Sequence, residues 1–184
     1  MKTPVIAISG TPGTGKTAVA RLLARRLGAN LITVPYLMRK KQLRYGYDRK
    51  RRTKVIDERE FARAVKRNIG TGRTNIVESH LSHLVKADFV FVLRTNPDAL
   101  EKRLKRRNWP AAKIRENVEA EMLDEITIEA LENNKNVYEI DTSKLGAPAT
   151  ARLIGQILNN FHHGKKYRPG DIDWTGHAKR YLTR

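Results

Sequence analysis

The octapeptide at residues 10–17 decides the fold of this 184-residue chain, and it reads Gly10-Thr11-Pro12-Gly13-Thr14-Gly15-Lys16-Thr17. It fits GxxxxGK[ST], a pattern whose glycines let backbone N–H groups turn toward a bound phosphate. Residues 2–9 before it are mostly apolar and predict a strand. Residues 16–27 after it have one apolar face and predict a helix, with Gly28 as its C-terminal stop. A glycine loop that joins a strand to a helix predicts a phosphate-binding site, because the helix N-terminus adds partial positive charge.

The two residues that end the octapeptide predict how a nucleotide triphosphate would be held. Lys16 is expected to bridge the β- and γ-phosphates of ATP, and the Thr17 hydroxyl to coordinate Mg²⁺. The alternative, a glycine turn with a chance lysine, is disfavoured by the flanking strand and helix. The sequence therefore predicts an ATP-binding protein that uses Mg²⁺.

A second candidate group follows the apolar residues at 75–77. Glu78 would end a buried strand and offer a carboxylate to Mg²⁺ or its waters. His80 lies two residues further along an extended chain, on the same side, where it could polarise a water or hold Glu78. A surface or helix-capping role for Glu78, and a packing role for His80, remain open at this stage.

Alternating apolar patterns predict the fold class. Further strands are expected at residues 31–34, 76–77, 89–93 and 137–140. Helices are expected at residues 58–68, 97–107, 111–133 and 147–161. Strands that alternate with helices favour a parallel sheet with helices on both faces, an α/β three-layer architecture that binds ligands beyond the carboxyl ends of its strands.

Charge and composition restrict the function further. The chain has 37 Lys and Arg against 19 Asp and Glu, a net charge of +18, and no cysteine. Disulfides and thiolate zinc sites are therefore excluded. No apolar run approaches the roughly 20 residues of a membrane helix, so we expect a cytoplasmic protein without membrane contact. The positive field would attract nucleotides, RNA or acidic partners, although a solvated surface explains any single charged run.

Other phosphate-loop classes fit the chain less well than a small kinase. The chain lacks the Asn-Lys-x-Asp motif of GTPases, and helicases and transporters need larger or repeated units. Several further motifs resemble the family of adenylate kinase isoenzyme 6, also described as a coilin-interacting nuclear ATPase and ribosome-assembly factor, in its archaeal branch. The resemblance covers most of residues 4–145. In addition to the octapeptide at 10–17, it rests on six short motifs: GYD at 46–48, VIDE at 55–58, VESH at 77–80, FVLRT at 91–95, RNW at 107–109 and ENVEAE at 116–121.

The resemblance implies a division of the chain and a set of site residues. Residues 1–161 would form the kinase domain, with a monophosphate-binding arm at 31–54, a short lid at 106–116 and a basic C-terminal extension at 162–184. Arg39 would contact the monophosphate, and Lys144 would lie beside the adenine. Further lid-side cations are Arg103, Arg106 and Arg115. The residues implied to bind ATP are Gly13, Thr14, Gly15, Lys16, Thr17, Ala18 and Arg107.

The resemblance also implies two functions. The first is transfer of phosphate from ATP to AMP or a related monophosphate, giving two diphosphates, with slower ATP hydrolysis. The second is a nucleotide-switched assembly factor in small ribosomal subunit maturation, with a ribosomal protein of the subunit platform as partner. Residues 39–54, with nine Lys or Arg against Asp48, and the C-terminal arm would suit ribosomal RNA, and Tyr36, Tyr45 and Tyr47 could stack on bases.

Three features depart from the family pattern. Family members commonly have aspartate at the position of Glu78. Arg49, Lys50, Arg51 and Arg52 stand where eukaryotic relatives are acidic, and the C-terminal arm is unlike theirs.

Overall fold

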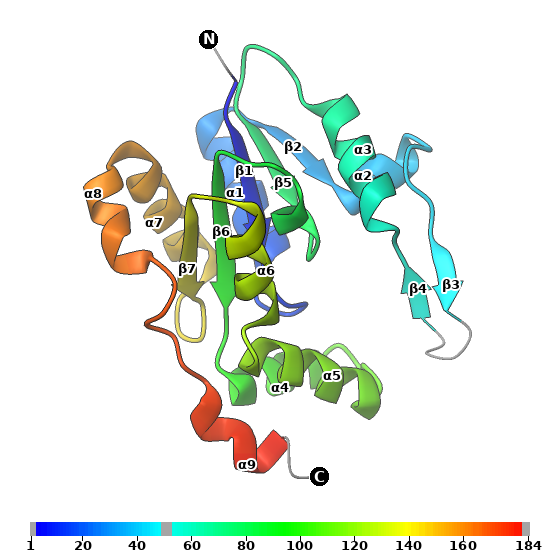
Figure 1. The fold of residues 1–184 in the computed structure, drawn as a ribbon, viewed down its shortest axis with the longest axis vertical. Helices are drawn as coiled ribbons and strands as arrows, with labels where there is room; N and C mark the ends of the chain where they lie inside the picture. The colour runs from blue at the N-terminus through cyan, green and yellow to red at the C-terminus, as the bar shows by residue number, and fades with distance from the viewer. Residues whose placement is uncertain (1–2, 49–52, 182–184) are drawn as a thin grey trace.

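A five-stranded parallel sheet forms the centre of the computed structural model, which describes residues 3–48 and 53–181 (Figure 1). The strand order is β2-β5-β1-β6-β7, and every neighbouring pair is parallel. This arrangement confirms the predicted α/β class. The strands are β1 (Val5–Ser9), β2 (Asn30–Thr33), β5 (Asn75–Glu78), β6 (Phe89–Arg94) and β7 (Val137–Asp141).

Helices cover both faces of the sheet because side chains along β1 alternate between two cores. Ile6 and Ile8 pack with residues of α1 (Lys16–Leu27) and α7 (Ala147–Asn159) on one face. On the other face, α3 (Glu58–Asn68) and α6 (Glu125–Asn133) cover the sheet. The sheet is therefore the middle of three layers. The phosphate loop follows directly from the carboxyl end of β1.

The long helix expected at residues 111–133 is two helices. α5 (Ala111–Met122) and α6 are separated at Asp124, whose backbone is left-handed with φ 56°. The Asp124 carboxylate is ion-paired with buried Arg94, so a tertiary contact fixes this break. The helix expected at 97–107 also ends early, because α4 (Pro97–Lys105) is followed by a turn with Asn108 at φ 54°.

A helix and a hairpin that the sequence patterns missed follow β2. The strand expected at 31–34 ends at Thr33, whose hydroxyl accepts a hydrogen bond from the Tyr36 N–H at 3.2 Å and caps α2 (Val34–Arg39). The antiparallel strands β3 (Gly46–Asp48) and β4 (Thr53–Val55) then project beside the sheet (Figure 1). The basic run at residues 49–52 lies outside the described residues.

The C-terminal segment runs along the β7 edge of the sheet to α4 and α5 (Figure 1). The helix expected at 147–161 ends at Asn159, since Asn160 is extended. Arg168 lies over the Tyr138 ring, 4.7 Å from its centroid. Near the end, Tyr181 is buried among apolar residues of α4 and α5, and its hydroxyl donates to Asp98 Oδ1 at 2.9 Å. The short elements of this segment are α8 (Phe161–Gly164), η2 (Lys165–Tyr167), η3 (Thr175–His177) and α9 (Ala178–Tyr181).

Over residues 3–48 and 53–181, the structure contains no helix with the length and apolar character to cross a bilayer.

Candidate functional site

The glycine loop between β1 and α1 is organised around one carbonyl. The Thr11 carbonyl accepts hydrogen bonds from the Thr14 N–H at 3.2 Å, the Thr14 hydroxyl at 2.9 Å and the Lys16 ammonium at 3.1 Å. Gly13 and Gly15 have φ of 102° and 98°, which other residues rarely adopt. The loop therefore holds Lys16 against its own backbone, within reach of an anion above it.

Gly10, where the chain leaves β1, should tolerate no side chain. Its φ is 130°, and an added Cβ would lie 2.3 Å from the Leu93 carbonyl oxygen of β6. We expect Gly10→Ala to lower the free energy of unfolding by at least about 2 kcal/mol, measured by urea denaturation. Gly176→Ala, where a Cβ would meet no atom within 4 Å, is the control and should change it by less than about 1 kcal/mol. Equal effects of the two substitutions would contradict this account of the loop.

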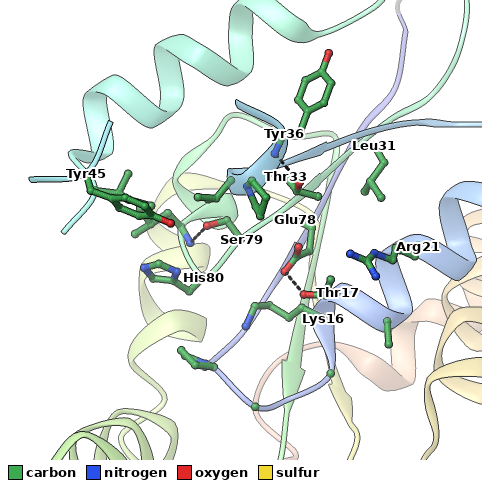
Figure 2. Close-up of a pocket in the computed structure, with 18 of the residues that line it drawn as sticks. Lys16, Thr17, Arg21, Leu31, Thr33, Tyr36, Tyr45, Glu78, Ser79 and His80 are labelled. Carbon is green, nitrogen blue, oxygen red and sulfur yellow. Dashed lines mark hydrogen bonds between the residues drawn. The ribbon is translucent and has the colours of Figure 1, made fainter. Parts of the chain in front are cut away.

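Thr17 and Glu78 form the part of the site that fits Mg²⁺. Glu78 ends β5, in register with Ile8 of β1, and its Oε1 accepts a hydrogen bond from the Thr17 hydroxyl at 3.1 Å (Figure 2). Mg²⁺ prefers oxygen ligands and keeps several waters, so one hydroxyl and one carboxylate beside a triphosphate suit it. The extra methylene of glutamate does not prevent this side chain from reaching the phosphate loop.

The pKa values of Lys16 and His80 are both lowered in this site. The pKa of Lys16 is lowered to about 8, first by burial and then by Arg107, while Glu78 and Glu121 oppose the change. His80 is exposed and lines the cavity, yet its pKa is lowered to about 4, first because the surrounding protein desolvates the ring and then because Lys16 is near. The His80 ring is therefore neutral near pH 7.

A single cavity of about 1020 Å³ brings the loop together with the projecting hairpin. Figure 2 shows Lys16, Thr17 and Glu78 at one wall, and His80 and Tyr45 at another. The cavity is also lined by apolar and aromatic side chains, most of them from α2 and the residues around the hairpin. They are Leu31, Val34, Pro35, Tyr36, Tyr45, Val55, Ile56 and Leu81.

Most of the predicted site residues line this cavity. They are Gly13, Gly15, Lys16, Thr17, Ala18, Arg39, Glu78, His80 and Arg107. Thr14 is buried within the loop instead, where its side chain bonds the Thr11 carbonyl. Lys144 is exposed in the loop after β7, away from the lining of this cavity.

Several residues that line the cavity were not predicted from the sequence to belong to it. Arg21 of α1 lines the cavity, and its position four residues after Thr17, on the same helix face, was the available signal. Tyr36 and Tyr45, expected to stack on RNA bases, line the cavity as well. The sequence could not place Tyr36 and Tyr45 in the cavity, because α2 and the hairpin that position them were not predicted.

Arg103 has a different surrounding from the one expected of a lid cation. Its guanidinium donates to the Thr142 carbonyl at 2.7 Å and to the Thr95 hydroxyl at 3.2 Å, and lies 3.5 Å from the Gly13 carbonyl oxygen. It therefore joins α4 to the loop after β7 and to the phosphate loop. Arg106 and Arg115 are exposed and do not line the described cavity.

A cluster of ion pairs around buried Arg94 contacts the phosphate loop through Glu121 and Thr11. Arg94, at the end of β6, pairs with Glu121 at 2.8 Å and with Glu139 and Asp124. The Glu121 carboxylate also accepts from the Thr95 N–H at 3.0 Å and from the Thr11 side chain. Two of the motifs singled out in the sequence, FVLRT and ENVEAE, thus meet through Arg94 and Glu121.

Comparison with known proteins first places the fold in a class. The chain resembles a thymidylate kinase from Candida albicans (TM-score 0.53, 15% identity, 88% of this chain and 94% of that one). It also resembles a deoxyadenosine kinase from M.mycoides (TM-score 0.57, 17% identity, 84% of this chain and 98% of that one). At these identities the likeness concerns the fold alone, which is that of P-loop nucleotide kinases.

Closer relatives then define the family. Residues 6–124 match the family described as an AAA domain. A protein of Thermococcus kodakarensis is 40% identical over 172 residues, 93% of each chain. One of Archaeoglobus fulgidus is 43% identical over 174 residues, 92% of this chain and 91% of the relative. Both carry the name "Putative adenylate kinase". The chain belongs to this archaeal family of adenylate-kinase-like P-loop proteins.

Proposed function

We propose that this protein is a nucleoside monophosphate kinase that transfers the γ-phosphoryl group of ATP to AMP and releases two ADP. The observation that carries the proposal is that one cavity is lined both by the phosphate loop with Lys16 and by Arg39, Tyr36 and Tyr45. Two anionic nucleotides can be brought together there. The names of the archaeal relatives support the same activity.

The described residues divide the work of such a transfer. Lys16 would stabilise negative charge on the β- and γ-phosphates, and Arg39 would hold the phosphate of AMP. Thr17 and Glu78 would hold Mg²⁺, which when bound would neutralise part of the triphosphate charge. Arg107, from the turn between α4 and α5, would add charge from the lid side. The AMP phosphate is already nucleophilic, so the transfer needs no general base.

We propose the same division of the chain that the sequence analysis predicts. Residues 31–54 act as the monophosphate arm and 106–116 as the lid. Residues 162–184 act as a C-terminal extension whose described part packs against the kinase domain at 1–161. Thr14 contributes its backbone to the phosphate loop. Lys144 would approach the adenine of ATP from the loop after β7, where its neighbour Ser143 accepts a hydrogen bond from Arg103 at 3.4 Å.

We further propose membership of the adenylate kinase isoenzyme 6 branch, with slow ATP hydrolysis and a role in small ribosomal subunit maturation. For hydrolysis, neutral His80 beside Glu78 could orient a water. The alternative is a nucleotide-switched assembly factor that binds a platform ribosomal protein and ribosomal RNA. The basic stretch at residues 39–54 favours it, since Arg39, Lys40, Lys41 and Arg44 follow one another on or after α2.

The deciding experiment measures ADP formed from ATP and Mg²⁺, with and without AMP, for the native protein and Arg39→Met. A kinase should show strong stimulation by AMP, and Arg39→Met should raise the KM for AMP by about 10- to 100-fold while the KM for ATP changes little. Lys66→Met, on the exposed face of α3, is the control. Slow hydrolysis that AMP does not change would refute the kinase and favour the assembly factor.

A further inference from the structure

Three side chains form a chain of hydrogen bonds between the end of β1 and the surface of α6. Ser9 Oγ lies 2.9 Å from His83 Nδ1, and His83 Nε2 lies 2.7 Å from Glu129 Oε2. Ser9 is 0% exposed and His83 only 1%, whereas the Glu129 side chain is 44% exposed. No step of the proposed reaction uses these groups.

The carboxylate of Glu129 determines which nitrogen of His83 carries the proton. An ionised carboxylate only accepts hydrogen bonds, so Nε2 must be the protonated nitrogen of a neutral ring. Nδ1 then has a free lone pair and accepts the Ser9 hydroxyl proton. Serine is too deeply buried here to serve as a nucleophile, so a role in positioning is what the arrangement allows.

Ser9 has one hydroxyl proton and three acceptors within reach. Besides His83 Nδ1, its Oγ lies 3.5 Å from the Ser79 carbonyl oxygen and 3.4 Å from that of His80. Both distances exceed that of a normal O–H···O bond, which is about 2.7–2.8 Å. Without His83 as an acceptor, the proton would turn to one of these carbonyls and draw it several tenths of an ångström toward β1.

The segment that would move forms one wall of the phosphate cavity. Ser79, His80 and Leu81 all line it. The rest of this segment is firmly attached, since the Ser82 hydroxyl contacts the Ile8 carbonyl at 2.9 Å and Asn134 Nδ2 donates to the His83 carbonyl at 2.7 Å. Ser9 therefore adjusts the part of the segment that carries His80.

We propose that His83 is a positioning residue of the phosphate site: together with Glu129 it directs the Ser9 hydroxyl away from the Ser79 and His80 carbonyls and so fixes the cavity wall. The kinetic consequences rest on the proposed kinase function. None of the groups proposed to hold ATP belongs to Ser79, His80 or Leu81, so we expect the wall to affect the transfer step more than ATP binding.

Two substitutions of His83 separate its two hydrogen bonds. His83→Asn places an amide oxygen near the position of Nδ1 and can keep the bond from Ser9. His83→Gln places an amide nitrogen near Nε2 and keeps only the bond to Glu129. We expect the kcat of His83→Asn to stay within about threefold of native and that of His83→Gln to fall about tenfold. The KM for ATP should be unchanged in both variants. Equal losses would overturn the proposal.

A measurement independent of catalysis uses the full-length protein labelled with ¹⁵N. Nuclear magnetic resonance should show His83 protonated on Nε2 only, and Glu129→Ala should shift the amide signals of Ser79, His80 and Leu81. Glu132→Ala, an exposed change on the same helix with the same loss of charge, should leave them in place. A proton on Nδ1, or equal shifts for the two variants, would refute the role of His83. If the native protein transfers no phosphate, the proposed function fails and these spectra alone decide the positioning role.

Discussion

Lys16→Ala should reduce the rate of ADP formation from ATP and AMP by about 1,000-fold, the loss typical when a group that stabilises transition-state charge is removed. The Lys16 ammonium is 3.1 Å from the Thr11 carbonyl oxygen, at the opening of α1, and needs only to turn toward a bound triphosphate. A coupled assay for ADP at saturating ATP and AMP measures the effect.

The same substitution should leave the fold intact. Burial lowers the pKa of Lys16 to about 8, so its charge is held at some cost in free energy. Removing the charge relieves that cost, whereas losing the aliphatic stem removes packing, and the two effects oppose each other. We expect the free energy of unfolding to change by less than about 1 kcal/mol. Lys66→Ala on α3 is the activity control, and a rate for Lys16→Ala within tenfold of native would contradict the assigned role.

Arg94→Met should lower the free energy of unfolding by about 3–5 kcal/mol, because it leaves buried carboxylates without their cation. Glu121 and Glu139 are 2% and 4% exposed, and both pair with Arg94. Urea denaturation near pH 8 measures the loss. Arg152→Met, an exposed change on α7, should cost less than about 0.5 kcal/mol.

The loss in Arg94→Met should depend on pH. Burial already raises the pKa of Glu121, and without the guanidinium it would rise further. A carboxyl group with a raised pKa in the folded state binds its proton more readily there than in the unfolded chain, so stability falls as pH rises. The loss should therefore be smaller at about pH 5 than at about pH 8. The double variant Arg94→Met/Glu121→Leu should recover part of the stability, and a larger loss at low pH would contradict this account.

The sequence predicted the parts of this molecule that depend on short-range patterns. The glycine loop, α1 and the five strands of the sheet follow from apolar periodicity and from glycines at their ends. The place of Glu78 and His80 in the cavity wall was also predictable, because a carboxylate at the end of a buried strand lies beside the phosphate loop. These residues lie next to one another because the ends of parallel strands meet at one edge of the sheet.

Most of the features that the sequence did not predict depend on contacts between distant residues, whereas the Thr33 cap on α2 is a local signal that the apolar patterns do not include. Asp124 breaks the expected helix at 111–133 because its carboxylate pairs with Arg94, thirty residues earlier. Thr33 ends β2 by capping α2, and Tyr36 and Tyr45 line the cavity only once α2 and the hairpin are folded. Arg103 was expected among the cations on the lid side, yet its guanidinium donates to the Thr142 carbonyl after β7 and to the Thr95 hydroxyl, and no local pattern predicts these partners.

The place of Tyr181 has a consequence for how the chain acquires its structure during synthesis. The apolar cluster that contains Leu100, Leu104 and Val118 also contains Tyr181. Tyr181 follows its hydrogen-bond partner Asp98 of α4 by 83 residues. The sheet and the phosphate loop consist of residues made much earlier, and domains can fold while translation continues. The side of α4 and α5 that receives Tyr181 stays open to solvent until Tyr181 itself has been synthesised, so a chain stalled before it would expose that side.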